Sequence, residues 1–586
     1  MKRILLLSVI LAMSCQKGKE SSSSAEFAEI AKSYFKGKNE LNPLDATING
    51  QEEYNSMLQL EMTDEYRKKR GDFFREYEKM LEKIDTTELD AEEKLSYGII
   101  KWETVIEQEL LKYPSNLIPL NQFTGTHLAI GQFAGGTSAQ PFKNEKDYRD
   151  FHARMEKYAV WIDSAIVYMK KGIKQNVVLP KSLTVKVIPQ FEDMTKGKTE
   201  DHLFYSAIKL MPESISSSTA DALAKDYATT IEQKLIPAFQ RMTKFLKEEY
   251  LPASRETSGI GVLPFGKDYY ATLAKYWTTT SMTPEEIHET GLREVARLRS
   301  EMEKVKAQVG FEGSIIDFFG YVRNKKELKP FTKPEEVIAN FEKIHQKIKP
   351  NVDRLFSLQP KTPFEVRRTE AFREQSASAE YVQGTADGSR PGIFYVPIPD
   401  VTAYNYYADE DLFLHEAIPG HHYQISLQQE NDKLPDFRRF NWIGAYGEGW
   451  ALYTESLGKE LGLYEDPYQY FGMLSSEMHR AIRLVVDTGI HTKGWTREQA
   501  IKYSMENEAE PEYSIISEIE RYMAIPGQAL SYKIGQMKII DLRKTAEKQM
   551  GEKFDIRKFH EIVLESGVLP LALLEDKVMA WVNSNK

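Results

Sequence analysis

Cysteine is almost absent from this sequence, which contains only Cys15 among its 586 residues. No disulfide can form within the chain, and the body of the protein cannot contain a zinc site built on cysteine. Any bound metal would therefore depend on His, Asp or Glu ligands. A G-x-S-x-G motif is also missing, which argues against a serine hydrolase.

An excess of positive charge and long apolar runs are missing too. The formal net charge is -10 and the pI is near 5.8, so the chain is not suited to neutralising phosphates and we expect no nucleic-acid partner. Apolar residues make up 41% of the chain, charged residues 28%, and the mean hydropathy is -0.48. These values are typical of a folded globular protein and exclude a polytopic membrane protein.

The N-terminus has the features of an export signal. Lys2 and Arg3 precede an apolar run at 4–13, which is too short to span a bilayer but suits a signal peptide. The end of this run resembles a bacterial lipobox at Cys15, although Ala12 stands where Leu is commoner. The resemblance implies a lipid on the Cys15 thiol, attachment to a membrane through that lipid, and a place in the bacterial cell envelope, on the periplasmic or outer-surface side. An ordinary signal peptide with an accidental cysteine is the alternative.

We predict three parts along the chain. Residues 1–15 form the lipoprotein signal peptide, residues 16–25 a polar tether, and residues 26–586 one large α-rich body. No repeat of fixed period and no long low-complexity linker interrupts the body, and a possible subdivision lies near residue 260. Oligomeric state is not indicated.

The body is predicted to be mainly α-helical. Apolar residues three and four positions apart predict helices at 148–174 and 220–249, and Thr283 with Glu286 forms a capping-box pattern at the start of another. Short strands are predicted at 184–189 and 392–397. The second follows a turn-like segment, so we expect an edge strand in a small β element that borders a cleft.

A histidine-rich segment contains the strongest chemical signal. Zinc peptidases use H-E-x-x-H on one helical face, but here His415-Glu416 is followed by four residues before His421 and His422. On an ideal helix His422 would return to the same face, yet about 10 Å further along the axis. The intervening Pro-Gly pair can kink the helix and bring His421 back beside His415. We favour His421 as the second metal ligand, with His422 as the alternative or as a supporting residue.

A later segment offers the third ligand. Glu448 lies 27 residues after His421, which is enough for a loop and a returning helix. With two histidines it would leave one position of a zinc ion open for water. Glu455 lies seven residues further on the same helical face and is expected to support the site from behind. The neighbouring glycines, Gly447 and Gly449, would let the helix approach a metal closely.

Two more segments are predicted to contribute. Asp487 and His491 continue a polar stripe that begins at Arg480 and Arg483; Asp487 would orient a histidine, and His491 would act as a hydrogen-bond donor in catalysis. The alternative is an internal network of ion pairs. Tyr522 and Tyr532 are candidates to stabilise an oxyanion. Four residues are predicted to bind substrate, with Arg521 or Lys533 holding a peptide carboxylate: Arg390, Arg521, Gln528 and Lys533. Packing or surface roles are the alternatives.

Four motifs together resemble the bacterial "domain of unknown function 885" family: HEAIPGHHYQ, EGWALYTE, RLVVDTGIH and RYMAIPGQALSYKIG. The pairing of His415-Glu416 with Gly447-Glu-Gly-Trp-Ala451 is similar to the gluzincin metallopeptidases, in which a later helix supplies a glutamate ligand. The resemblance covers most of the chain after the tether. It implies a large helical, gluzincin-like body with the small β element beside the active-site cleft.

The predicted function is a zinc-dependent hydrolase of peptide bonds with a peptide substrate. One zinc ion would be held by His415, His421 and Glu448, and Glu416 would act as general base for a metal-activated water. Two alternatives remain open. One is a lipid-anchored protein that binds a ligand or metal without catalysis, and the other is a zinc amidase or esterase that acts on non-peptide bonds.

Overall fold

The computed structural model describes residues 22–586, apart from 371–373, 375–376, 386–387 and 389. The predicted signal peptide, Cys15 and most of the tether lie outside the described residues. Helix α1 (Ser22–Leu41) already includes residues 22–25, so the predicted tether was too long at its end. None of the described helices is both long enough and apolar enough to cross a bilayer.

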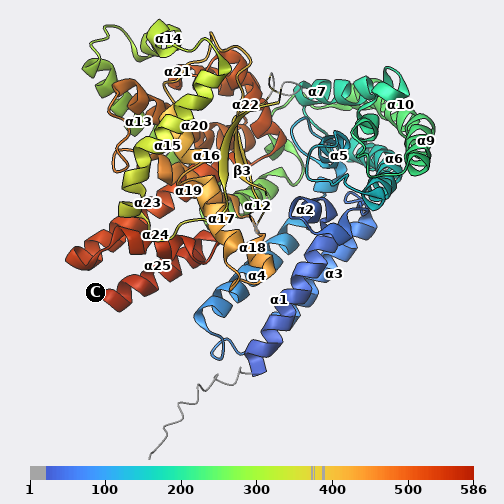
Figure 1. Cartoon of the computed structure of the whole chain (residues 1–586), viewed down its shortest axis with the longest axis horizontal. Coiled ribbons are helices and arrows are strands. Elements are labelled where there is room, and N and C mark those ends of the chain that lie inside the picture. Colours follow the sequence, from blue (N-terminus) through green and yellow to red (C-terminus); the bar gives the residue numbers. More distant parts are fainter. Residues whose placement is uncertain (1–21, 371–373, 375–376, 386–387, 389) are drawn as a thin grey trace, which may run out of the picture.

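The first half of the chain forms helices α1 to α11, coloured blue to green in Figure 1. Their bounds are α1 Ser22–Leu41, α2 Pro43–Ile48, α3 Asp64–Leu81, α4 Ala91–Leu110, α5 Thr126–Ala134, α6 Glu145–Gln175, α7 Lys181–Glu192, α8 Ser206–Lys209, α9 Ser217–Thr230, α10 Ile236–Phe245 and α11 Leu251–Ala253. Helix α1 buries one face, which includes Phe27, Ile30 and Tyr34, at the helical period. The Tyr34 hydroxyl donates to Glu103 of α4 (2.7 Å), which fixes the two helices together.

The two predicted long helices of this half are confirmed. The segment 148–174 lies within α6. The segment 220–249 is a continuous helical stretch in which π-helical turns separate and follow α9 and α10. The strand predicted at 184–189 is wrong, because it lies inside α7, where Val187, Ile188 and Phe191 are buried on one helical face. Their spacing of three and four outweighs a short apparent alternation.

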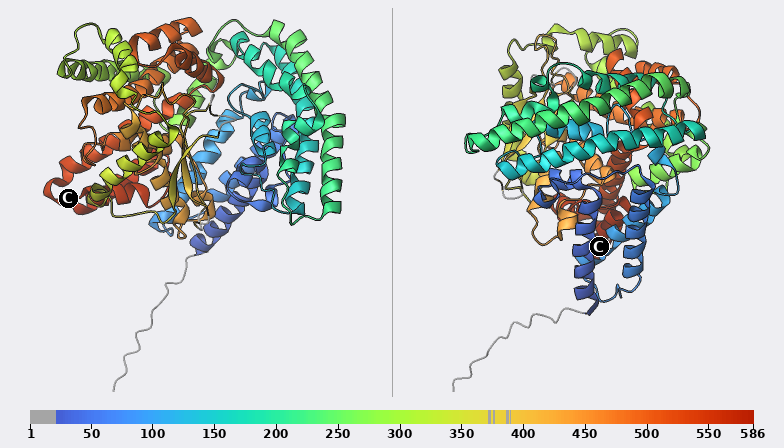
Figure 2. Two further views of the ribbon diagram at one scale, coloured as in Figure 1. Left: turned by 45° about the horizontal axis from the view of Figure 1, so that its top comes forward. Right: turned by 90° about the vertical axis from the view of Figure 1, so that its right-hand side faces the viewer.

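The second half forms the other side of the molecule, coloured green to red in Figures 1 and 2. Its helices are α12 Gly266–Thr278, α13 Pro284–Gln308, α14 Ile315–Asn324, α15 Pro334–Leu355, α16 Asp409–Glu416, α17 His421–Glu430, α18 Asp436–Arg439, α19 Gly444–Glu455, α20 Pro467–Thr492, α21 Arg497–Asn507, α22 Glu512–Ala524, α23 Ser531–Met550, α24 Ile556–Leu564 and α25 Leu571–Asn585. The predicted capping box at the start of α13 is confirmed, because Thr283 Oγ1 accepts from Glu286 N (3.2 Å) and the Glu286 carboxylate accepts from Thr283 N (2.8 Å). The predicted subdivision near residue 260 stays a prediction.

One small sheet interrupts this helical body in the described part of the chain. Its strands are β1 (Phe364–Arg368), β2 (Glu380–Val382) and β3 (Gly392–Val396), in the order β1-β3-β2. Strand β3 confirms the strand predicted at 392–397, but it is the central strand, parallel to β1 and antiparallel to β2, and not an edge. Four of its five residues are buried, and Phe394 packs against Phe341 of α15.

Candidate metal centre

A break between two short helices places the first two candidate ligands. Helix α16 ends at Glu416 and α17 begins at His421. A Cβ atom added to Gly420 would lie 1.9 Å from the carbonyl oxygen of His415, so only glycine lets the chain fold back over the end of α16. The turn is fixed to α19 by Trp450, whose Nε1 donates to the carbonyl of Pro419 (2.9 Å). The predicted kink is thus a break that returns His421 to His415.

Three side chains converge at this break. His415, His421 and Glu448 each offer one ligand atom, and these atoms all lie within 4.8 Å of one another. Oε2 of Glu448 is 3.4 Å from Nε2 of His421 and 3.8 Å from Nε2 of His415. Ligands at zinc bond lengths in a tetrahedron are about 3.4 Å apart, and the two separations from Glu448 are close to this value, so the three residues are a candidate ligand set for one metal ion. The structure brings together the three residues predicted from the sequence.

Glu455 supports His415 from behind, as expected. Its Oε1 forms a hydrogen bond with Nδ1 of His415 (2.7 Å), and the Glu455 side chain is only 2% exposed. This bond fixes the imidazole and leaves Nε2 as the nitrogen that faces Glu448 and His421. The supporting carboxylate therefore comes from the same helix, α19, as the glutamate of the cluster.

Replacing Glu455 by glutamine is expected to weaken zinc binding about 10- to 100-fold, because an amide neither orients His415 as firmly nor increases its basicity as a carboxylate does. A competition titration with a chromophoric zinc chelator measures this loss. Thr454→Ser, which changes the adjacent residue of α19 and keeps a hydroxyl, is the control. Unchanged affinity in Glu455→Gln would contradict the supporting role.

His422 points elsewhere, so it is not brought to the cluster. Its Nδ1 lies 3.0 Å from the hydroxyl of Tyr381 on β2, and its ring packs against Phe364 of β1 at 4.9 Å. Consecutive residues of a helix differ by about 100° in direction, which turns His422 toward the sheet when His421 faces Glu448. Burial lowers the pKa of His422 to about 4.

The cluster favours a positive charge at its centre. Burial alone would lower the pKa of His415, but the bonds to Glu448 and Glu455 outweigh it and raise this pKa to about 10. Burial alone would raise the pKa of Glu448, but the two imidazoles hold it well below its usual range. The pKa of Glu416 is raised by burial.

A cavity of about 680 Å³, which we call the metal cavity because the three candidate ligands line it, also exposes Glu416. Strand β2 supplies Glu380 and Tyr381 to its lining, so the predicted β element does border the cleft. Arg521 and Tyr532 also line this cavity, as predicted. Arg521 donates from Nη2 to Tyr532 (3.4 Å), which places both at one wall.

Two predicted site residues, Asp487 and His491, are buried in the core and do not reach the cluster. Asp487 accepts from the hydroxyl of Tyr270 and from Gly527 N (3.1 Å), so it orients no ligand histidine. Both ring nitrogens of His491 form hydrogen bonds inside the core. Nδ1 accepts from the backbone N–H of Ile260 (3.0 Å), and Nε2 lies 3.0 Å from the carbonyl oxygen of Tyr522. Neither residue lines the metal cavity. Both predicted roles were wrong because these residues lie one and two turns beyond Arg483 on α20.

Tyr522 is also placed away from the cavity lining. Its hydroxyl donates to Glu518 (2.8 Å) and accepts from Nε of Arg483 (3.1 Å), and the residue is 2% exposed. The hydroxyl is therefore committed to an ion-pair network, and Tyr532 is left as the tyrosine that faces the cavity.

Three of the four residues predicted to bind substrate do not line this cavity. Lys533 is 1% exposed and pairs with Glu477 and with Glu294 (3.0 Å), so its ammonium is neutralised inside the protein. The side-chain oxygen of Gln528 accepts a hydrogen bond from Arg521 (2.9 Å), so Gln528 holds that arginine in place without lining the cavity itself. Arg390 is exposed and donates to the carbonyl of Gln383 (3.2 Å).

The two glycines of α19, Gly447 and Gly449, have a packing role that was not predicted. A Cβ on Gly449 would lie 2.5 Å from Cα of Gly535, and one on Gly447 would lie 2.2 Å from the ring of Trp442. These glycines allow α19 to cross α23 with backbones in contact and to accept an indole ring. They position Glu448 through helix packing.

Several residues that line the cavity were not predicted as site residues from the sequence. His479 lines the wall, hydrogen-bonds to Glu508 and lies 3.5 Å from Glu518. Glu510 and Trp442 line the same cavity. The acidic residues before Arg521 and the clustering of histidines were the available signals in the sequence. Neither signal shows which way a side chain points in the fold.

The comparisons with known proteins agree with this architecture. A family model described as "Bacterial protein of unknown function (DUF885)" matches residues 43–578, so the chain belongs to this family and the predicted membership is confirmed. A solved structure, "the putative lipoprotein from Colwellia psychrerythraea", is similar with a TM-score of 0.89 and 29% identity, covering 96% of this chain and 100% of that one. "A putative lipoprotein of unknown function from Shewanella oneidensis" matches with a TM-score of 0.67 and 21% identity, covering 94% and 99% of the two chains. The comparison with curated proteins gives no match.

Proposed function

We propose that the protein is a zinc-dependent hydrolase of peptide bonds. The observation that supports this most strongly is the convergence of His415, His421 and Glu448 within 4.8 Å, with Glu416 on the wall of the same cavity. A bound zinc ion would supply a Lewis acid that lowers the pKa of water toward neutrality. Three protein ligands leave a position open for that water, as catalytic sites require.

Glu416 is the general base of the proposed mechanism. It lies next to the ligand His415 in sequence but is not part of the cluster, so its carboxylate is available for proton transfer. It takes a proton from the attacking water and passes it to the leaving amine. The raised pKa of this buried carboxylate suits both steps.

Tyr532 is the proposed hydrogen-bond donor to the oxyanion. Its ring lies beneath the guanidinium of Arg483, 4.5 Å from the ring centroid, and its hydroxyl is within 3.4 Å of Arg521. The Tyr532 hydroxyl accepts hydrogen bonds from Arg521 and Gln528, so its own proton is available to a bound oxyanion. The ligand arrangement, two histidines at one helix break and a glutamate from a separate helix, supports a gluzincin-like site with one zinc ion.

The chain is proposed to be lipid-anchored at Cys15 in the bacterial envelope, on the periplasmic or outer-surface side. The lipobox-like end of the signal and the two similar proteins named as lipoproteins support this. Metabolic labelling of producing cells with a fatty-acid analogue should mark the protein but not its Cys15→Ser variant. Equal labelling of both would contradict the anchor.

The experiment that tests the activity is hydrolysis of a mixed peptide library. The zinc-loaded protein is expected to cleave peptides, to lose this activity in a chelator, and to regain it when zinc is restored, with products read by mass spectrometry. If zinc-replete protein cleaves no peptide, the hydrolase proposal fails and a non-catalytic binding protein is favoured. Cleavage of only ester or non-peptide amide substrates would favour the amidase or esterase alternative.

A further inference from the structure

Three arginines line one wall of the metal cavity, and they differ in their partners. Arg483 and Arg521 both pair with Glu518, at 2.8 and 3.2 Å. Arg480 forms no ion pair with any residue that the structure describes, and its one hydrogen bond runs from Nη1 to the carbonyl of Ser476 (3.3 Å). Its Nε is buried without a partner, and so is Nη1 of Arg483, a residue only 5% exposed.

Unpaired guanidinium donors in a buried wall are costly unless a ligand satisfies them. The planar fork of arginine fits a carboxylate, which can accept two hydrogen bonds at once. Glu510, which lies in the same cavity, does not come within ion-pair distance of Arg480. Asp411, Glu416 and Glu510 all lie near enough to interact electrostatically with Arg480. None of them forms an ion pair with its guanidinium in the described part of the chain, so its donors remain available to a ligand.

Arg480 also lies close to the reacting groups. It projects from α20, which packs against α16, the helix that ends at Glu416. Arg480 and Glu416 both line the cavity. A carboxylate bound at Arg480 would therefore lie beside the bond that Glu416 helps to break.

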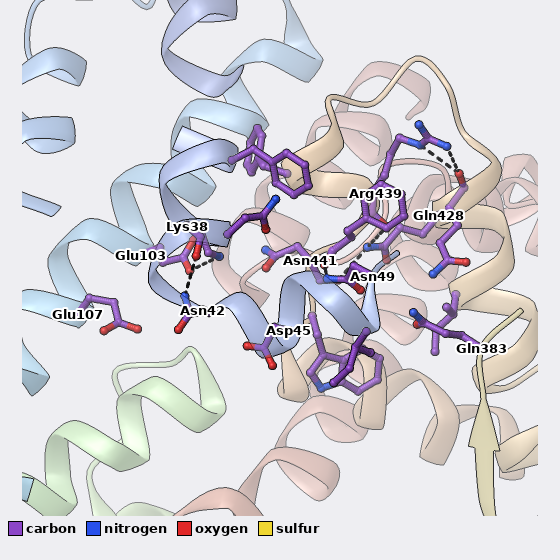
Figure 3. Close-up of a pocket in the computed structure, with 18 of the residues that line it drawn as sticks. Lys38, Asn42, Asp45, Asn49, Glu103, Glu107, Gln383, Gln428, Arg439 and Asn441 are labelled. Carbon is purple, nitrogen blue, oxygen red and sulfur yellow. Dashed lines mark hydrogen bonds and ion pairs between the residues drawn. The ribbon is translucent and has the colours of Figure 1, made fainter. Parts of the chain in front are cut away.

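A second cavity, of about 490 Å³, adjoins the first at Ile425 and Trp442, which line both. Figure 3 shows it with carboxamides such as Asn49 and Asn441 among its lining. Each cation that lines it within the described chain is already paired: Lys38 with Glu103, Arg70 with Glu107 and Arg439 with Asp436. The adjoining cavity thus offers amides for a peptide backbone, while the unpaired positive charge is at Arg480.

We propose that Arg480, assisted by the free Nη1 of Arg483, binds a carboxylate of the substrate next to the cleaved bond. The substrates are then peptides with either a free C-terminal carboxylate or an acidic side chain near that bond. This inference rests on the proposed peptide-hydrolase function. The remainder of the peptide extends past Trp442 into the amide-lined cavity.

The test measures binding without turnover. Calorimetric titration of the zinc-loaded Glu416→Gln protein uses peptides of one sequence with a free C-terminus, with an amidated C-terminus, or with acidic side chains replaced by amides. Arg480→Gln is expected to weaken binding of the carboxylate peptide about 10- to 100-fold, and removing the carboxylate from the peptide should cost about as much. The two losses should not add, because they remove the same contact. Arg480→Lys should recover part of the affinity, and Arg149→Gln, an exposed arginine of α6, is the charge-matched control.

The two peptide changes identify the source of the carboxylate, and non-additivity with either one supports the proposal. Additive losses, or equal affinity for all three peptides, would overturn it. Cleavage of the peptide library by wild-type protein is measured alongside. If peptides are cleaved without regard to Arg480 or carboxylates, this inference fails and the hydrolase proposal stands; if nothing is cleaved, the hydrolase proposal fails and the binding cycle still decides the role of Arg480.

Discussion

Glu416→Gln is expected to bind zinc normally and to lose about 10²- to 10⁴-fold in kcat. Glutamine has nearly the same shape as glutamate but cannot take a proton from water. The zinc affinity should persist because Glu416 is not among the three clustered ligands. Metal content by atomic spectroscopy and kcat on a peptide from the library measure the two effects on the same preparation.

Glu410→Gln provides a matched control on the same helix, α16. Glu410 is also buried, but its carboxylate accepts from Tyr464 N (2.6 Å) and does not line the metal cavity. Its variant should keep the wild-type kcat. If Glu416→Gln turned over peptide at the wild-type rate with full zinc content, Glu416 would not be the base.

Much of the helical fold could be predicted because its signals are local. The capping box of α13 needs only Thr283 and Glu286, and α6 needs only a regular apolar face. Local patterns fail where they are short, as at 184–189, where six residues fit a strand but the longer segment is a helix. The sheet could be placed but not ordered, because strand pairing joins β1 and β3 across segments distant in sequence.

The candidate ligands could be predicted because two motifs, at 415–421 and at 447–455, each contain ligand-type residues with few alternatives. The choice between His421 and His422 could not be made from spacing, because it depends on backbone dihedrals at the helix break. Gly420 decides it, because a Cβ at this position would lie 1.9 Å from the carbonyl oxygen of His415, so only glycine permits this backbone path. In a regular helix, His422 and not His421 would lie on the same face as His415.

The residues of α20 show the limit of periodicity. A stripe of polar residues predicts which face of the helix is polar, but not where along its length that face borders a cavity. Arg480 and Arg483 meet the cavity, whereas Asp487 and His491 lie roughly 10 Å further along the axis, against Tyr270 and Ile260. Tertiary packing outside α20 determines this difference, so the sequence of α20 cannot reveal it.

His421→Ala is expected to lose zinc affinity by more than about 100-fold, above the range typical of a supporting residue, because it removes one of three ligands. Wild-type protein at a zinc concentration 1,000 times its Kd should be stabilised by about 4 kcal/mol, and most of that stabilisation should vanish in the variant. Zinc titration and thermal unfolding with and without zinc measure the two losses.

His422→Ala is the matched control, because it removes a neighbouring imidazole that is also buried, by the same substitution. It should keep zinc affinity and the zinc-dependent rise in Tm, since its Nδ1 faces the hydroxyl of Tyr381 and not the cluster. Its metal-free stability should fall by about 1–3 kcal/mol, because that hydroxyl loses its partner inside the protein. The two variants thus separate a ligand from a packing histidine, and the opposite pattern, with zinc lost in His422→Ala and retained in His421→Ala, would move the metal centre toward the sheet.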